Sequence, residues 1–284
     1  MLKCSTNLDY AERVARAVDY IETHLDDDID LDRLASVACF SPFHFHRIYR
    51  GLMQETVAET VRRLRLHRGA VELVERRHPM TRIAARAGYG SVAAFNRAFR
   101  AAYGVPPAAF RDLRESVWRS VSQQKDDTMF QVTIRDIAPM HLAALAHTGD
   151  YQAIGLKFDR LMAWAGGRGL IGADTRSIGI YYDVPEDVPI DKLRSDACVT
   201  VPEGYVVDGD IRVVDLPGGR HAVLAYVGPY ADLSQAYHWL FSEWLPKSGE
   251  ETADRPCFEE YLNNPREHPP SEWRTDICLP LASR

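Results

Sequence analysis

Two adjacent carboxylates, Glu259 and Glu260, interrupt a stretch that is otherwise apolar from Cys257 to Leu262. The stretch has the pattern of a β-strand, so its side chains alternate, and one glutamate points inward while the other points toward solvent. A carboxylate buried among aromatic rings is costly unless it is paired or a cation arrives, and aromatic faces attract cations directly. The group suits an amphipathic, cationic small molecule. An ordinary aromatic core, with both glutamates near an exposed strand end, is the alternative.

The half of the chain that holds these glutamates is rich in aromatic residues that could wall such a site. His141 and His221 open matching strands and are interpreted as structural. The sequence shows no Ser-His-Asp, Cys-His or metal-ligand constellation, so we expect no catalytic residue, no metal and no cofactor. The five cysteines are widely spaced and include no Cys-x-x-Cys, which argues against a disulfide framework or a zinc site. The candidate ligand-binding residues are Glu259, Tyr151, Trp164, Tyr181, Tyr226, Tyr230, Trp239 and Tyr261.

A second group of residues recurs 50 positions apart in the other half of the chain. The pattern Ser-x-x-x-Phe-x-Arg-x-aromatic-Arg runs from Ser41 to Arg50 and again from Ser91 to Arg100. In each copy the two aromatic residues are four apart and share one helix face, which packs inward, while the arginine between them projects elsewhere. Each serine is expected to cap a helix. The pattern predicts two helix-turn-helix units, whose second helices present Arg, His and Asn to the DNA major groove.

The elements that must position these groups differ between the two halves. Residues 1–116 read as helical and residues 129–284 alternate strand-like with helix-like patterns, with a polar linker at 117–128. The second half also repeats, because Arg194–Cys198 matches Arg274–Cys278 at an offset of 80. We expect two β-α-β-β units that pack as a pseudo-twofold pair with a cleft between them.

Charge is divided unevenly along the chain. The formal net charge of −6 disfavours nucleic-acid binding at first sight. Segment 40–114, however, has 14 basic and 5 acidic residues, and all 14 are Arg, whereas segment 1–39 has 4 basic and 9 acidic residues. Arginine contacts phosphate and guanine bidentately. The division therefore favours DNA binding by the first half, and the acidic second half could rest against the basic face of the first.

The first half resembles the DNA-binding domain of AraC/XylS-type transcription regulators. The resemblance implies base contacts by Phe43, His46 and Arg47 in one half-site and by Val92, Ala93, Asn96 and Arg97 in the other. Val92 and Ala93 cannot form hydrogen bonds to bases, so the second helix reads less sequence, and Gln54 stands where the family has a glycine. The resemblance rests on Leu31–Ala35, Ser41–Arg47, Arg63–Leu66, Ile83–Ala84, Ala87–Ser91, Phe95–Phe99 and Tyr103–Arg111. The candidate DNA-binding residues are Ser41, Phe43, His46, Arg47, Arg50, Ser91, Val92, Asn96, Arg97 and Arg100.

The second half resembles the GyrI-like small-molecule-binding domain. The resemblance is carried by Gly228–Tyr230, Trp239–Trp244, Phe258–Pro265 and Arg274–Leu281. It implies that Glu259 is the ligand-facing carboxylate. In the internal repeat its counterpart is Gly179, so the pseudo-symmetry is broken where a ligand needs asymmetry.

Together these features predict a multidomain protein: an all-α double helix-turn-helix domain followed by an α+β GyrI-like domain of two pseudo-twofold β-α-β-β repeats. The expected function is a cytoplasmic transcription regulator that binds double-stranded DNA, senses a small cationic or aromatic effector and works with RNA polymerase. No membrane contact is expected, because no apolar run approaches the ~18 residues of a spanning helix. Two alternatives stay open: a GyrI-like hydrolase of strained, electrophilic genotoxins fused to a DNA-binding domain, and a DNA-organising protein with a vestigial pocket.

Overall fold

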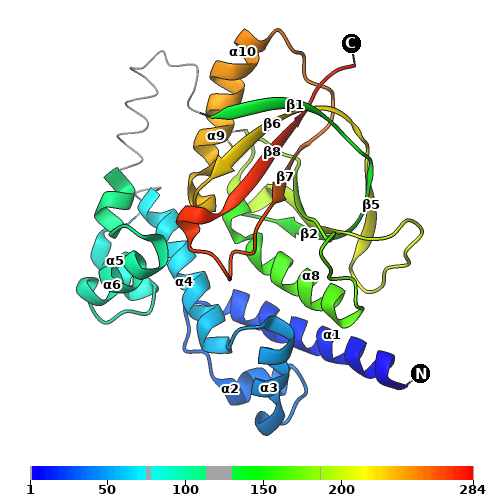
Figure 1. Cartoon of the computed structure of the whole chain (residues 1–284). Helices are drawn as coiled ribbons and strands as arrows, with labels where there is room; N and C mark the ends of the chain where they lie inside the picture. Colours follow the sequence, from blue (N-terminus) through cyan, green and yellow to red (C-terminus); the bar gives the residue numbers. More distant parts are fainter. Residues whose placement is uncertain (1, 75–77, 113–129, 186, 284) are drawn as a thin grey trace. The chain divides into compact units, whose positions relative to one another are not determined.

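The computed structural model describes residues 2–74, 78–112, 130–185 and 187–283 (Figure 1). The predicted linker at 117–128 lies outside these residues, and so do the side chains of residues 2–9 and of Phe43. The chain divides into two compact units. The first unit comprises residues 1–65, 141–177 and 183–215, and the second comprises 66–140, 178–182 and 216–284. No helix of the described residues is long and apolar enough to cross a membrane.

The helices that the first unit takes from residues 1–65 form one helix-turn-helix. They are α1 (Leu2–Thr23), α2 (Leu31–Val37), α3 (Pro42–Met53) and the first part of α4 (Val57–Val74). Phe45 and Tyr49 of α3 are buried in one apolar cluster with residues of α1 and α2. Thr56 and Glu59 exchange capping hydrogen bonds at the start of α4. The predicted inward-facing aromatic pair of α3 is confirmed.

The second unit repeats this arrangement with the end of α4, α5 (Met80–Arg86) and α6 (Val92–Tyr103). Phe95 and Phe99 of α6 are buried with Ile83 and Ala84 of α5. The correspondence with the first unit extends to the backbone. The helix before the turn ends at a left-handed residue, Cys39 (φ 54°) or Gly88 (φ 82°), and the helix after it ends at Gln54 (φ 58°) or Gly104 (φ 76°). The second turn is one residue longer, as the repeat offsets predict.

The remaining elements form two β-α-β-β repeats. In the first repeat they are β2 (Met140–Thr148), α8 (Gly155–Gly167), β3 (Ser177–Tyr181) and β4 (Arg194–Thr200). In the second they are β6 (Gly219–Val227), α9 (Leu233–Trp239), β7 (Cys257–Tyr261) and β8 (Arg274–Pro280). Strands β3 and β7 start 80 residues apart, as do β4 and β8, and the burial patterns of β2 and β6 agree at eight of nine positions. The predicted internal repeat is confirmed.

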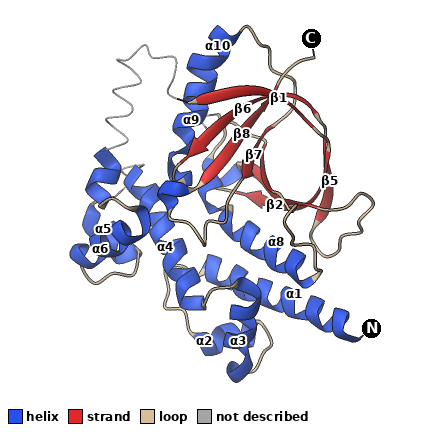
Figure 2. Cartoon of the chain, viewed as in Figure 1, coloured by secondary structure: helices blue, strands red, loops and turns tan. Residues whose placement is uncertain are grey.

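Further strands and short helices complete the repeats. Strand β1 (Gln131–Ile137) lies at one edge of the second unit, where the strand order is β1-β6-β8-β7-β3. Strand β5 (Arg212–Leu216) belongs to the first unit, where the order is β4-β2-β5. The strand pairs β1/β6, β6/β8, β7/β8 and β2/β4 are antiparallel. Figure 2 shows strands β1, β6, β8 and β7 together with helix α9. The short helices are η1 (Tyr151–Ala153), η2 (Ile190–Lys192), η3 (Tyr230–Asp232), the π-helical turn η4 (Leu240–Trp244), α10 (Leu245–Ser248) and η5 (Pro270–Glu272).

Helix α9 covers one face of the second unit's sheet. Tyr226 and Leu224 of β6 and Ile277 of β8 are buried in one apolar cluster with Ala236 and Trp239 of α9. Register places Glu259 opposite Ile277, and directly paired residues of neighbouring strands point to the same face. Glu259 therefore lies on the face that α9 covers.

Helix α8 packs against α1 within the first unit (Figure 1). Leu156 and Ala163 of α8 are buried in the same apolar cluster as Phe45. The charge division predicts basic side chains from the first half of the chain and acidic ones from the second half at such a contact. Two of the three ion pairs nearby are reversed, because α1 contributes the carboxylates and α8 the basic groups. The ion pairs are Lys157 with Glu22 (3.7 Å), Arg160 with Asp19 (3.6 Å) and Arg63 with Asp159 (2.7 Å).

The left-handed residue at the end of α3 yields a prediction about stability. Gln54 adopts φ 58°, a conformation that costs a residue with a Cβ about 1–2 kcal/mol, whereas glycine adopts it freely at a smaller entropic cost. Gln54→Gly is therefore expected to raise the free energy of unfolding by about 0.5–1 kcal/mol in urea titrations. The matched control is Gly104→Gln at the equivalent position of α6, which should lower it. Changes of the same sign at both positions would contradict this explanation.

Candidate functional site

The first candidate DNA-reading helix is α3. Arg47, His46 and Arg50 are exposed on it, while the aromatic residues between them are buried. Ser41 is the N-cap residue, although its side chain accepts no capping hydrogen bond, and Pro42 follows in the first turn. Phe43 was predicted to contact bases, but its side chain lies outside the described residues. The exposed residues of α3 thus include two imidazole groups, those of His44 and His46, and two guanidinium groups.

The second candidate helix, α6, presents a less polar surface. Ser91 caps it by accepting a hydrogen bond from the N–H of Ala94 at 3.2 Å, and Arg97 and Arg100 are exposed. Val92 is half-buried against the core of this unit. Asn96 is half-buried, and its Oδ1 has no hydrogen-bond partner among the described residues. This oxygen is itself buried, so a contact between Asn96 and a DNA base stays a prediction.

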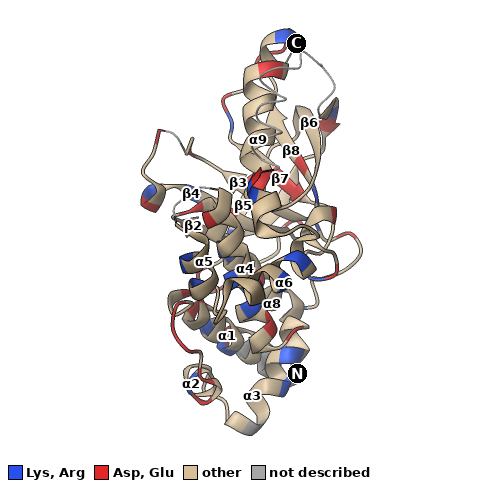
Figure 3. Ribbon diagram, turned by 90° about the vertical axis from the view of Figure 1, so that its left-hand side faces the viewer, with Lys and Arg blue, Asp and Glu red and all other residues tan. Residues whose placement is uncertain are grey.

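Several arginines of the basic segment 40–114 form ion pairs and hydrogen bonds within the fold. Figure 3 shows where basic and acidic residues lie along the ribbon. Arg63 lies between Glu55 (2.6 Å) and Asp159 (2.7 Å). Burial lowers the pKa of Arg63, but the charges of these two carboxylates outweigh burial and hold the pKa above its usual value. Three others bind backbone carbonyl groups or a carboxylate: Arg65 with Leu25 and Asp27, Arg68 with Arg86, and Arg86 with Glu72.

The second candidate site is centred on Glu259, which is only 3% exposed. The Tyr261 hydroxyl donates a hydrogen bond to Oε2 of Glu259 at 2.8 Å. Burial raises the pKa of Glu259 to about 7, although the hydroxyls of Tyr261, Tyr237 and Tyr181 act to lower it. No ion pair to Glu259 is present among the described residues. We call Glu259, Tyr181, Tyr230, Tyr237 and Tyr261 the Glu259 cage.

Two tyrosines from neighbouring strands of the cage form a hydrogen-bond chain. The hydroxyls of Tyr181 on β3 and Tyr261 on β7 are 2.6 Å apart. Because Tyr261 gives its proton to Glu259, Tyr181 is the donor in the second bond. Gly179 makes this geometry possible, since a Cβ there would lie 2.8 Å from the Tyr261 hydroxyl and 2.9 Å from the Tyr181 ring. The counterpart of Glu259 in the first repeat therefore shapes the same site.

The remaining walls of the cage are also aromatic. The ring of Tyr230 meets Tyr261 edge-on at 5.2 Å and stacks on Trp273 at 4.3 Å. Burial raises the pKa of the Tyr230 hydroxyl, and the charge of Glu259 raises it further. Burial also raises the pKa of Tyr226, whose hydroxyl donates a hydrogen bond to the carbonyl of Pro229 at 3.0 Å. The phenols stay neutral, so Glu259 is the cage group whose charge changes near neutral pH.

Three of the predicted ligand-binding residues are engaged elsewhere. The Tyr151 hydroxyl, in the first unit, donates to the carbonyl groups of Asp183 and Arg194 at 3.0 Å. The Trp164 indole N–H, also in the first unit, donates to Asp208 at 2.9 Å. Trp239 belongs to the apolar cluster under α9, where its ring meets Phe130 edge-on at 5.4 Å. Their ligand contacts stay predictions, and the structure groups only Tyr181, Tyr226, Tyr230 and Tyr261 around Glu259.

Sequence reasoning missed Tyr237, Cys257 and Trp273. The Tyr237 hydroxyl is buried and forms no hydrogen bond of good geometry within the described residues, although it lies close enough to influence Glu259. Burial raises the pKa of the Cys257 thiol to about 12, and Glu259 adds to the rise. The alternation of the strand could have identified Cys257, which is two residues before Glu259. No sequence pattern pointed to Tyr237 on α9.

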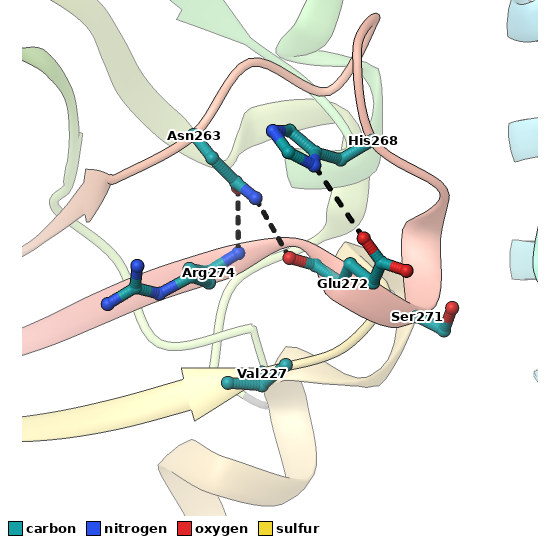
Figure 4. Close-up of a pocket in the computed structure, with 6 residues that line it drawn as sticks. All are labelled: Val227, Asn263, His268, Ser271, Glu272 and Arg274. Atoms are coloured by element: carbon teal, nitrogen blue, oxygen red, sulfur yellow. Dashed lines mark hydrogen bonds and ion pairs between the residues drawn. The ribbon is translucent and has the colours of Figure 1, made fainter.

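A separate, open hollow of about 370 Å³ lies beside the cage strands (Figure 4). Asn263 ties two of its segments together by accepting from the Arg274 N–H at 2.9 Å and donating to the Glu272 carbonyl at 2.8 Å. None of the predicted ligand-binding residues lines it. The lining residues are Val227, Asn263, His268, Ser271, Glu272 and Arg274.

Comparison with known proteins assigns both halves. Residues 130–282 match the profile of the GyrI-like small-molecule-binding domain, and residues 34–113 match that of a helix-turn-helix domain. A DNA gyrase inhibitor of Edwardsiella piscicida is 35% identical over 156 residues, which are 53% of this chain and 97% of the inhibitor.

Two solved structures share lower similarity. The EcmrR–DNA complex is 16% identical, with a TM-score of 0.48, over 86% of this chain and 83% of EcmrR. A hydrolase from Listeria innocua is 15% identical, with a TM-score of 0.40, over 54% of this chain and 92% of the hydrolase.

The raised pKa of Glu259 yields a prediction about stability. The native state holds the Glu259 proton up to about pH 7, whereas the unfolded chain releases it near pH 4.5. The native state thus binds more protons between these values, so the contribution of Glu259 to stability falls as pH rises through the window and is constant above it. Glu259→Gln should remove a loss of about 2–3 kcal/mol between pH 5 and pH 8 in urea titrations. Glu260→Gln, on the opposite face of the strand, should retain the wild-type slope; equal slopes for all three proteins would refute the assignment.

Proposed function

Because the chain belongs to the GyrI-like small-molecule-binding family and carries an AraC-type helix-turn-helix domain ahead of that segment, we propose that it controls transcription in response to a small, cationic, aromatic molecule. The two domains make it a DNA-binding regulator with a small-molecule-binding domain. The effector binds in the Glu259 cage, and α3 and α6 read two parts of one DNA site. RNA polymerase is the proposed partner at the promoter.

One observation carries the effector class. Glu259 is buried without an ion pair among the described residues, and burial holds its pKa near 7. A cation in the cage would pair with the carboxylate and stack on neutral phenol rings, which favours both partners. A neutral ligand would leave the carboxylate uncompensated, and an anion would be repelled. Charge selectivity therefore follows from the cost of desolvating Glu259.

The exposed side chains of the recognition helices support the DNA-binding part of the proposal. Arg47 and His46 on α3 can read guanine and phosphate, whereas α6 exposes Arg97 and Arg100 but buries the Oδ1 of Asn96. Val92 turns its side chain toward the core and adds no polar contact. We therefore expect the first half-site to be read more stringently than the second.

The hydrolase alternative is supported by the same carboxylate, since a general base with a pKa near 7 is suited to activating water. The two functions differ in turnover. A sensor binds a tetraphenylphosphonium cation and leaves styrene oxide intact, whereas a hydrolase converts styrene oxide to the diol and loses this activity in Glu259→Gln.

Removing the exposed guanidinium of α3 should weaken specific DNA binding. On an operator selected in vitro with the full chain, Arg47→Ala is expected to cost about 1–3 kcal/mol and to relax discrimination at one base pair, as measured by fluorescence anisotropy. Arg16→Ala, an exposed arginine of α1, is the matched control and should change affinity by less than about 0.5 kcal/mol. Unchanged affinity and base preference in Arg47→Ala would exclude this base contact.

The effector proposal predicts a pH-dependent affinity for cations. Tetraphenylphosphonium should bind the ionised cage, so its affinity should be about tenfold weaker at pH 6 than at pH 8 and level off above pH 7. Triphenylphosphine oxide, a neutral analogue, should show no such dependence. Glu259→Gln should abolish the dependence and weaken cation binding at pH 8 by at least about tenfold, or 1.4 kcal/mol. Titration calorimetry that finds the cation bound equally well at both pH values would refute the proposal.

A further inference from the structure

Two aromatic residues of the second repeat connect the Glu259 cage to short helices outside it. Tyr230 opens η3, and Trp273 follows η5. Their rings stack at 4.3 Å, and Tyr230 also meets the cage residue Tyr261 at 5.2 Å. A ligand that fills the cage must contact or displace Tyr230, and a shift of Tyr230 must move Trp273 because stacked rings cannot interpenetrate.

Each of these two residues adjoins a contact with the second helix-turn-helix. Ala231, the residue after Tyr230, is 4% exposed and is buried in the same apolar cluster as Phe95, Phe99 and Tyr103. Helix η5 contacts α6, and a Cβ on Gly104, at the end of α6, would lie 3.9 Å from the hydroxyl oxygen of Ser271. The cage wall is thus one or two residues away from the core and the end of α6.

The first repeat has the same backbone but lacks this connection. Tyr151, the counterpart of Tyr230, is fixed by hydrogen bonds to the carbonyl groups of Asp183 and Arg194. The counterpart of Trp273 is Leu193, which offers no ring for stacking. The first helix-turn-helix instead packs against α8, which contributes no residue to the cage as defined above.

We propose that occupancy of the Glu259 cage is transmitted through Tyr230 and Trp273 to the second helix-turn-helix, α5–α6, and not to the first, α2–α3. The inference rests on the proposed effector site. Helix η5 has room to respond, because Ser271 and Glu272 border the open hollow in Figure 4. The first helix-turn-helix then provides constant DNA affinity, and the ligand adjusts the position of α6 on its half-site. Linkage requires that DNA binding at that half-site change ligand affinity by the same factor.

Hydrogen–deuterium exchange of the full chain, with and without saturating tetraphenylphosphonium, tests this directly. We expect exchange rates in residues 80–103 to change at least threefold, while those in residues 31–53 change less than 1.5-fold. The first helix-turn-helix is an internal control, because both units experience the same solution. A change confined to 31–53, or equal changes in both segments, would overturn the proposal.

A variant outside the cage separates transmission from binding. Ala231→Gly removes the methyl group that enters the core of the second helix-turn-helix, so it should leave the dissociation constant of tetraphenylphosphonium within twofold and at least halve the exchange response in 80–103. Ala231→Ser, which retains the Cβ in this core, should keep most of the response. Gln152→Gly, at the equivalent position of η1, is the matched control and should retain the full response.

The outcomes distinguish this inference from the proposed function. If calorimetry shows no binding of tetraphenylphosphonium to the wild-type chain, both the effector proposal and this inference fail. If the cation binds with the predicted pH dependence but residues 80–103 do not respond, the effector proposal stands and the inference fails. A full response in Ala231→Gly would likewise refute transmission through η3.

Discussion

The burial of one carboxylate without a cationic partner is the constraint around which the second repeat is built. Taking a charged carboxylate out of water costs several kcal/mol, and the chain offsets part of that cost with the hydroxyls of Tyr261, Tyr237 and Tyr181. Those hydroxyls must converge on one point, which requires a strand position without a side chain at Gly179. The remaining cost appears as a pKa near 7, and it is the basis of the proposed affinity for a cation. An arginine beside Glu259 would neutralise the carboxylate and remove the basis of that proposed affinity.

Comparison of the two repeats shows where this specialisation was introduced. The strand framework is shared, down to the hydrogen bonds from Gly149 to Leu193 and from Gly228 to Trp273. At the equivalent of the cage the first repeat has glycine for Glu259, and its tyrosine at 151 closes a loop. Ion pairs at the sheet edge are retained in both copies, Arg212 with Asp196 and Arg135 with Asp276. The duplicated framework thus supports one candidate site, and the other copy supplies Gly179 and Tyr181 to it.

The sequence predicted the features that depend on periodicity and failed on those that depend on packing between distant segments. Both repeats and the inward aromatic pairs of α3 and α6 followed from spacings of four, 50 and 80 residues. The alternation of the strand predicted that one of Glu259 and Glu260 is buried, and the family resemblance selected Glu259. Tyr237 was missed because its position over Glu259 depends on how α9 crosses the sheet, which no local pattern encodes. Tyr151 and Trp164 were included on composition, although the polar atoms of both are engaged within the first unit. The arginine count likewise could not separate Arg47, which is exposed, from Arg63, which is held between two carboxylates.

The predicted domain boundaries at 116 and 129 mark a change in composition. The apolar cores nevertheless contain residues from both sides of these boundaries. Helices of seven and twelve residues are too short to enclose the apolar core of a helix-turn-helix on every side. In the first unit Leu156 and Ala163 of α8 complete the core, and in the second Ala231 of η3 does so. The core of each helix-turn-helix therefore includes residues of one GyrI-like repeat. Each of the two compact units contains one helix-turn-helix and segments of the GyrI-like domain. A regulator built in this way needs no flexible relay between sensing and DNA binding, because one residue of η3 already belongs to the core of a recognition helix.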